Sequence, residues 1–111
     1  MLNRGPGFAV LYRWRVEPEK EQAFIAAWTR ISELLLSERG SLGSRLHRGA
    51  DGLWYSYAQW PSSEARERAF AAGAVDAQAL EQLRSAIIES LPEVTLEPVS
   101  DLLVHVPSQD A

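Results

Sequence analysis

The sequence contains no cysteine, and this absence removes several kinds of site at once. Without thiols the 111-residue chain cannot form disulfides, thiolate zinc sites, iron–sulfur clusters or a cysteine nucleophile. Its only histidines, His47 and His105, lie far apart in the chain with no obvious carboxylate between them, which makes a poor metal site. We therefore expect no bound metal.

Excess positive charge and long apolar runs are also missing. The net charge of −4 argues against binding to a phosphate backbone, which needs a basic surface, so we expect no nucleic-acid partner. No apolar run approaches the ~20 residues of a membrane span, so we expect no membrane partner. The first residues lack the apolar stretch of a signal peptide, and a cytoplasmic location is the resulting expectation.

What the chain does contain is the mixture of a small globular protein, with 46% hydrophobic and 23% charged residues. A chain of this length buries roughly 65% of its unfolded surface, enough for one core. We expect a flexible segment over residues 1–7, a single domain over 8–106 and a polar tail over 107–111.

Alternating and helical apolar spacings predict the order strand, helix, strand, strand, helical segment, strand. The expected strands span residues 8–16, 41–50, 53–60 and 94–106, and the expected helices run from Pro18 to near Arg39, from Ser62 up to Gly73, and from Asp76 to Pro92. This order is typical of the α+β ferredoxin-like βαββαβ fold, an antiparallel sheet with helices on one face.

Such a sheet has a second face that the helices leave uncovered. Residues 8–16 and 53–60 carry large apolar or aromatic side chains on both faces, although the helices suffice for only one. Exposed apolar faces of that size usually mark an interface. The sequence therefore predicts a homodimer packed through its sheet faces.

Four segments, together with Phe24 and Trp28 in the first helix, resemble the antibiotic biosynthesis monooxygenase family of the dimeric α/β-barrel superfamily. These segments are Phe8–Val16, Gly40–Leu46, Tyr57–Trp60 and Ser62–Glu64 with the helices that follow. Family members are typically homodimers. Some oxygenate polycyclic phenols or quinols with molecular oxygen and neither metal nor flavin, others degrade haem, and many have no known activity.

The resemblance favours the cofactor-free branch. The haem-degrading branch relies on a histidine in the helical segment after the third strand, and His47 and His105 both fall in predicted strands. The cofactor-free branch commonly has a tryptophan at the end of the third strand, where Trp60 stands. The resemblance thus implies that no cofactor is required.

Asp51-Gly52 between two strand-like runs indicates a hairpin. If these two residues occupy the central turn positions, Ala50 faces Leu53 and the register of the strands follows. One face of the hairpin then combines two tryptophans, two basic side chains and several small residues: Gly43, Arg45, His47, Trp54, Ser56, Ala58 and Trp60. Small residues among large neighbours leave space, so this face predicts a small-molecule pocket.

The pocket residues can be given roles. An aromatic substrate could stack on Trp60, with Trp54 and Ser56 as further binding residues. His47 is the candidate base, because its ordinary pKa suits proton removal near neutral pH, and Arg45 could stabilise the resulting oxyanion. The plainer interpretations stay open: a structural or surface His47, a Trp60 that only fills the core, and an Arg45 paired with a surface carboxylate.

Two functions follow from these residues. The first is a cofactor-independent monooxygenase that acts on a small phenol- or quinol-type aromatic with molecular oxygen and depends on His47. The alternative is a non-catalytic dimeric small-molecule-binding or stress-response protein that uses the same pocket. Trp28, in the middle of an apolar helix stripe, is expected to be core.

Overall fold

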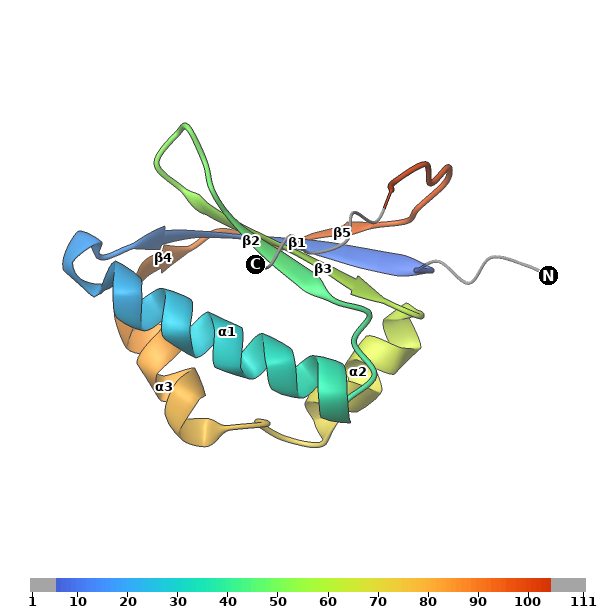
Figure 1. The fold of residues 1–111 in the computed structure, drawn as a ribbon, viewed down its shortest axis with the longest axis horizontal. Helices are drawn as coiled ribbons and strands as arrows, with labels where there is room; N and C mark the ends of the chain where they lie inside the picture. Colours follow the sequence, from blue (N-terminus) through green and yellow to red (C-terminus); the bar gives the residue numbers. More distant parts are fainter. Residues whose placement is uncertain (1–5, 105–111) are drawn as a thin grey trace, which may run out of the picture.

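The structure, a computed structural model, describes residues 6–104. Residues 1–5, the last two positions of the expected strand over 94–106 with His105, and the expected tail over 107–111 lie outside this range. Its helices lie together on one side of a single sheet (Figure 1). The elements in chain order are β1 (Phe8–Val16), the one-turn 3-10 helix η1 (Pro18–Lys20), α1 (Glu21–Glu38), β2 (Ser44–Arg48), β3 (Trp54–Trp60), α2 (Ser63–Ala71), α3 (Ala77–Ala86), β4 (Ile87–Ser90) and β5 (Val94–Leu96).

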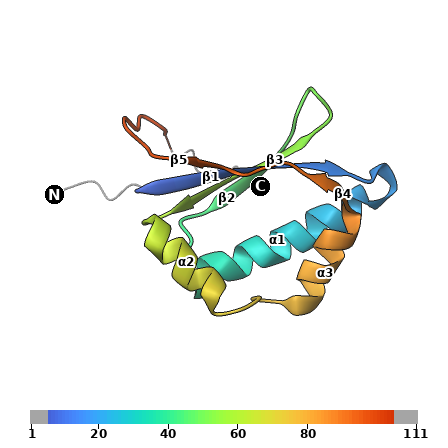
Figure 2. The same cartoon turned by 180° about the vertical axis from the view of Figure 1, so that it is seen from behind.

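The sheet is antiparallel, with the strand order β2-β3-β1-β4 and with β5 also paired to β1. The strand β1 therefore lies at the centre of the sheet. Strand β3 pairs with one of its edges, and β4 and β5 pair with different halves of its other edge. Seen from behind, the same three helices again lie below the sheet and its other face is open (Figure 2). The predicted α+β fold with helices on one face is confirmed.

The first strand and the first helix form where their patterns predict, whereas the strand expected over 41–50 spans only β2. Strand β1 has the predicted bounds, because its side chains alternate between the helix-covered face and the open face. Pro18 opens the helical segment, where a fixed φ and a missing N–H cost nothing. Helix α1 buries Phe24 and Ala27 and ends before Gly40, whose φ of 84° is readily available only to glycine.

Both later helices begin at side-chain caps that the sequence predicts. The Ser62 hydroxyl accepts a hydrogen bond from the Ala65 amide at 3.0 Å at the start of α2. A carboxylate oxygen of Asp76 accepts one from the Ala79 amide at 3.0 Å at the start of α3. Each cap satisfies an amide that has no partner within its own helix.

The expected helix from Asp76 to Pro92 is wrong in its second half. Helix α3 ends at Ala86, and Ile87–Ser90 forms the strand β4 against the second half of β1. The four-residue apolar spacing fits a helix, but pairing with β1 satisfies this backbone and overrides it. Within the described part of the expected strand over 94–106, only β5 forms, and residues 97–104 have no regular structure.

The hairpin register is also wrong by one residue. The Gly49 amide donates to the Leu53 carbonyl at 2.7 Å, so the loop has three residues rather than two. Within this loop only Gly52 takes a positive φ, of 86°, whereas the expected two-residue turn needs a positive φ at Asp51 as well. Arg45 consequently pairs with Tyr57 and His47 with Tyr55.

The core between sheet and helices has two clusters. Among the described residues, one contains Trp54 and Phe24, and the other contains Trp60 and Val10. Among the helices in the described part of the chain, none has the length and apolar character needed to cross a membrane.

Candidate functional site

A cavity of about 220 Å³ lies between the covered face of the sheet and the three helices. It is lined by Tyr12, Trp14, Trp28, Ile31, Ser32, Leu35, Ser44, Ser56, Ala58, Trp60, Phe70, Leu80 and Leu83. None of these side chains carries a charge at neutral pH, and only hydroxyl and indole groups supply polar atoms. A mostly apolar cavity with a few polar groups is the usual form of a small-molecule site.

Aromatic rings form much of the cavity wall. The rings of Tyr12 and Trp14 stack with a centroid distance of 5.7 Å and an angle of 3° between their planes. Trp60, 1% exposed, meets Phe70 edge to face at 5.8 Å. Trp28 completes the wall from α1 and is half-buried, so it is not only a core residue. Such walls suit a flat aromatic ligand, which can stack on or abut their rings.

Within residues 6–104, Tyr12 is the one lining residue with a charged partner. Its hydroxyl oxygen accepts a hydrogen bond from Nη2 of Arg66 in α2 at 2.8 Å. The same nitrogen donates to Oε1 of Glu93 at 2.7 Å, which holds the guanidinium in place. Burial raises the pKa of Tyr12 above its ordinary value, although the positive charge of Arg66 opposes this rise. The tyrosine is therefore protonated at neutral pH and can donate a hydrogen bond.

Ser56 lies directly across the sheet from Tyr12 and is also partly engaged. Its hydroxyl oxygen accepts a hydrogen bond from the Trp28 indole nitrogen at 3.0 Å. The Trp60 indole nitrogen is buried, and no group in residues 6–104 accepts its hydrogen bond. The hydroxyl hydrogen of Ser56 has no acceptor among the described residues, so it remains available to a ligand in the cavity.

The structure separates the residues that the expected hairpin register grouped. Trp60 and Ser56 line the cavity, whereas Trp54 packs in the neighbouring core cluster and is 4% exposed. Arg45 and His47 alternate onto the open face with Tyr55 and Tyr57, and Nε of Arg45 donates to Nε2 of His47 at 2.9 Å. Arg45 also borders a shallow groove with Trp54 at the β2 edge. The one-residue shift in register thus removes His47 and Arg45 from the cavity.

Sequence reasoning missed Tyr12, Trp14 and Arg66 as parts of the site. The alternation of β1 does place Tyr12 and Trp14 on the face with Val10 and Val16, so that signal was present. Nothing in the sequence indicates the partner of Arg66, because it lies 54 positions from Tyr12 and 27 from Glu93.

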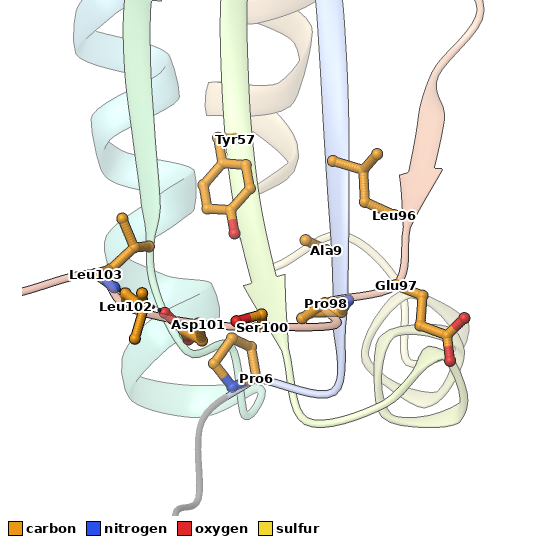
Figure 3. A pocket seen from close by; sticks show the side chains of 10 residues that line it. All are labelled: Pro6, Ala9, Tyr57, Leu96, Glu97, Pro98, Ser100, Asp101, Leu102 and Leu103. Atoms are coloured by element: carbon orange, nitrogen blue, oxygen red, sulfur yellow. Dashed lines mark hydrogen bonds between the residues drawn. The ribbon is translucent and has the colours of Figure 1, made fainter.

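A second hollow, of about 430 Å³, lies on the open face of the sheet (Figure 3). Residues 97–103 fold over this face, and the hollow lies between them, Pro6 and the strand residues Ala9, Tyr57 and Leu96. Figure 3 shows Tyr57 with its hydroxyl toward this segment. Leu102 and Leu103 lie at the side of the hollow opposite Leu96 (Figure 3). The long apolar side chains of this segment indicate contact with another surface rather than a catalytic site.

No group of three or more histidine, aspartate or glutamate side chains among residues 6–104 is close enough together to hold a metal ion. Asp51 and Tyr55, on the hairpin, form a separate pair in which the Tyr55 hydroxyl donates to the carboxylate. This bond lowers the pKa of Asp51 and raises the pKa of Tyr55; Asp51 is exposed and Tyr55 is half-buried on the hairpin. They lie apart from the cavity.

The sequence model of the antibiotic biosynthesis monooxygenases matches residues 7–80, about two thirds of the chain. The chain belongs to this family. The match spans β1, α1, β2, β3 and α2, which contribute most of the cavity wall. A search of curated protein sequences found no match.

Several solved structures share the fold at low sequence identity. A protein of Caulobacter crescentus CB15 named as an antibiotic biosynthesis monooxygenase superposes with a TM-score of 0.74 at 15% identity, over 87% of this chain and 93% of that one. SnoaB of Streptomyces nogalater, a cofactor-independent oxygenase, gives 0.68 at 19% identity over 86% and 95%. Rv0793 of Mycobacterium tuberculosis gives 0.70 at 18% identity over 86% and 98%. At these identities the likeness shows the fold.

Proposed function

We propose that this protein is a cofactor-independent monooxygenase that oxidises a small phenol- or quinol-type aromatic with molecular oxygen in the cavity between sheet and helices. The observation that carries the proposal is the cavity itself: an uncharged, aromatic-walled space in a family member whose structural neighbours include a cofactor-independent oxygenase. Its volume of about 220 Å³ is below the ~300–1,000 Å³ typical of sites for drug-sized ligands, which favours one or two rings.

The reaction balances without an external reductant when a phenol becomes a quinone. The hydroxyl hydrogen and the hydrogen of the attacked ring carbon leave with one oxygen atom as water. The other oxygen atom stays on that carbon as a carbonyl, and the phenol supplies all four electrons. The protein then has to bind the phenolate, stabilise its charge and keep out bulk water, and the apolar walls with free hydroxyl donors suit these tasks.

Trp60 and Ser56 keep the ligand-binding role that the sequence predicts for them, because both line the cavity. His47 lies on the opposite face, so the proposal assigns the substrate proton to solvent at the cavity mouth. Phe70, half exposed, borders both this cavity and an adjoining one of about 250 Å³ beside the loop between α2 and α3, which gives a route to solvent.

The proposal includes a homodimer formed through the open face of the sheet. Its support is the segment that follows β5, where Val99 is 91% exposed and Leu102 89% exposed. Apolar side chains gathered in this way on a surface usually mark an interface. The cytoplasmic location expected from the sequence stays a prediction.

One observation favours the alternative of a non-catalytic binding protein. Among residues 6–104 the lining contains no histidine or carboxylate, so this part of the chain gives the cavity no side chain whose ordinary pKa suits a general base. Such a protein would bind the aromatic and release it unchanged.

Oxygen uptake with a panel of quinols and small phenols, using chelator-treated protein, tests the proposal. Ala58→Leu, which fills the cavity floor, should reduce both uptake and binding, whereas Ala72→Leu, on the exposed end of α2, should leave them unchanged. Binding without uptake above the uncatalysed rate would establish the alternative. Uptake that chelation abolishes and iron restores would overturn the cofactor-free reaction.

A further inference from the structure

We propose that the Tyr12 hydroxyl is the specificity-determining hydrogen-bond donor of the cavity and selects aromatic ligands that carry an acceptor oxygen. This inference rests on the proposed function in one respect, because it takes the cavity to be the ligand site. It goes further in naming the residue that recognises the ligand and the ligand group that is recognised.

The direction of the Tyr12 hydrogen follows from its partner. A guanidinium has only donors, so in the 2.8 Å contact with Arg66 the tyrosine oxygen must be the acceptor. Among the described residues no hydrogen bond uses the hydroxyl hydrogen of Tyr12 itself. Glu93 accepts from the same nitrogen of Arg66 and holds it in place, and the positive charge beside the tyrosine oxygen polarises its O–H bond. Tyr12 is thereby set as a donor.

Ser56, the cross-strand neighbour of Tyr12, is also oriented as a hydrogen-bond donor by its partner. An indole N–H is donor-only, so the Ser56 oxygen accepts from Trp28 and its own hydrogen stays available. Ser32 and Ser44 are the lining hydroxyls that can serve either role. The floor of the cavity thus offers donors in excess of acceptors.

A ligand has to supply what these walls lack. A carbonyl or phenolate oxygen has two or more lone-pair directions and can accept from Tyr12 and Ser56. An aromatic amine would present further N–H donors to the donors of the cavity and leave some of them without an acceptor. A plain hydrocarbon would leave all of these donors without an acceptor. Unpaired buried donors are costly, and this gives the cavity its selectivity.

Binding of four compounds of similar shape tests the selectivity: naphthol, naphthoquinone, naphthylamine and naphthalene. Quenching of tryptophan fluorescence reports binding, since Trp14, Trp28 and Trp60 line the cavity. The wild-type protein should bind the two oxygen-bearing compounds about tenfold or more tighter than the other two, after correction for partition between water and octanol. Equal affinities after that correction would overturn the inference without any variant.

Tyr12→Phe keeps the ring stacked on Trp14 and removes only the hydroxyl. It should weaken naphthoquinone binding about 3- to 10-fold and naphtholate binding ~10-fold or more, because a donor stabilises a charged oxygen more strongly, and should leave naphthalene unchanged. Tyr55→Phe removes an exposed hydroxyl on the hairpin and should change none of these affinities. Loss of affinity for all four compounds alike would show that Tyr12 acts through packing.

The pKa of bound naphthol gives an independent readout. Hydrogen bonds to the phenolate favour its charged form, so Tyr12→Phe should raise the pKa of bound naphthol by about one unit relative to the wild-type complex. Absorbance of the naphtholate during a pH titration measures it, with no oxygen turnover involved. An unchanged pKa together with retained oxygen uptake would overturn this inference and leave the proposed function standing. The predicted rise in the pKa of bound naphthol without any oxygen uptake would support this inference and overturn the proposed function.

Discussion

Trp60 and Trp28 both border the cavity, but they differ in burial and therefore in what their removal should cost. Trp60 is 1% exposed and packs with Val10 and Ala69, so Trp60→Ala should lower the free energy of unfolding by about 3–5 kcal/mol. Trp28 is half-buried with one hydrogen bond, and Trp28→Ala should cost less. Urea unfolding of both variants measures the difference. A larger loss for Trp28→Ala would restore the sequence-based expectation that Trp28 is the core residue.

His47 offers a sharp test of the hairpin register. Because it lies on the open face with its Nε2 accepting from Arg45, His47→Ala should keep oxygen uptake within about twofold of the wild type, with the same pH profile. The proposed reaction instead follows ionisation of the phenol. A fall in rate of ~100-fold or more would show that His47 reaches the substrate after all.

Helix α2 depends on its cap more than the other helices do, since it is short and buries only Ala69. Ser62→Ala removes the acceptor of the Ala65 amide and should destabilise the protein by about 1 kcal/mol. Ser63→Ala, one position later and outside the cap, should be close to neutral. Thermal melting of both variants checks this, and equal effects would contradict a capping role for Ser62.

Helix α3 has a cap whose strength should depend on pH. Hydrogen bonds from the Ala79 amide and Arg30 lower the pKa of Asp76 in the folded protein. A lowered pKa contributes stability above the ordinary pKa of the group, and this is lost as the pH falls through the folded value. Asp76→Asn keeps a capping oxygen without charge, so its urea midpoint should be below the wild type at neutral pH and converge with it in acid. The same difference at both pH values would contradict this.

The elements also show where sequence patterns suffice and where they do not. Strand β1, helix α1 and the caps at Ser62 and Asp76 were predictable, because alternation, helical spacing and capping chemistry all indicate the same structure there. The segment Ile87–Ser90 was not, since its spacing fits a helix and only pairing with β1 decides for a strand.

The candidate site was predicted only in part for a similar reason. An Asp-Gly pair fits a two-residue turn or a three-residue loop with a positive φ at glycine, and the two differ by one residue of register. That residue decides which face each side chain occupies, so Trp60 and Ser56 were placed with His47, which lies on the other face. The role of Tyr12 depends on its hydrogen bond with Arg66, a contact that no local sequence pattern encodes.

For the whole molecule, the open face and the segment after β5 predict a dimer. Light scattering should give twice the chain mass at micromolar concentration. The double variant Val99→Asp/Leu102→Asp should shift the protein to the monomer, because two charges would be buried in the interface. Leu36→Asp, on an exposed turn of α1, serves as the control and should stay dimeric. A wild-type protein that remains monomeric would remove the proposed assembly.

The edges of the sheet have a consequence for misassembly. One edge is β2, which is five residues long and carries Arg45 and Arg48. The other edge is divided between β4 and β5, and Pro92 lies in the gap and has no N–H to donate. Neither edge offers a long uncharged row of free amides and carbonyls, so the sheet is a poor template for added strands. Lateral growth into amyloid-like fibrils is thereby discouraged, even though the other face of the same sheet is open to contact.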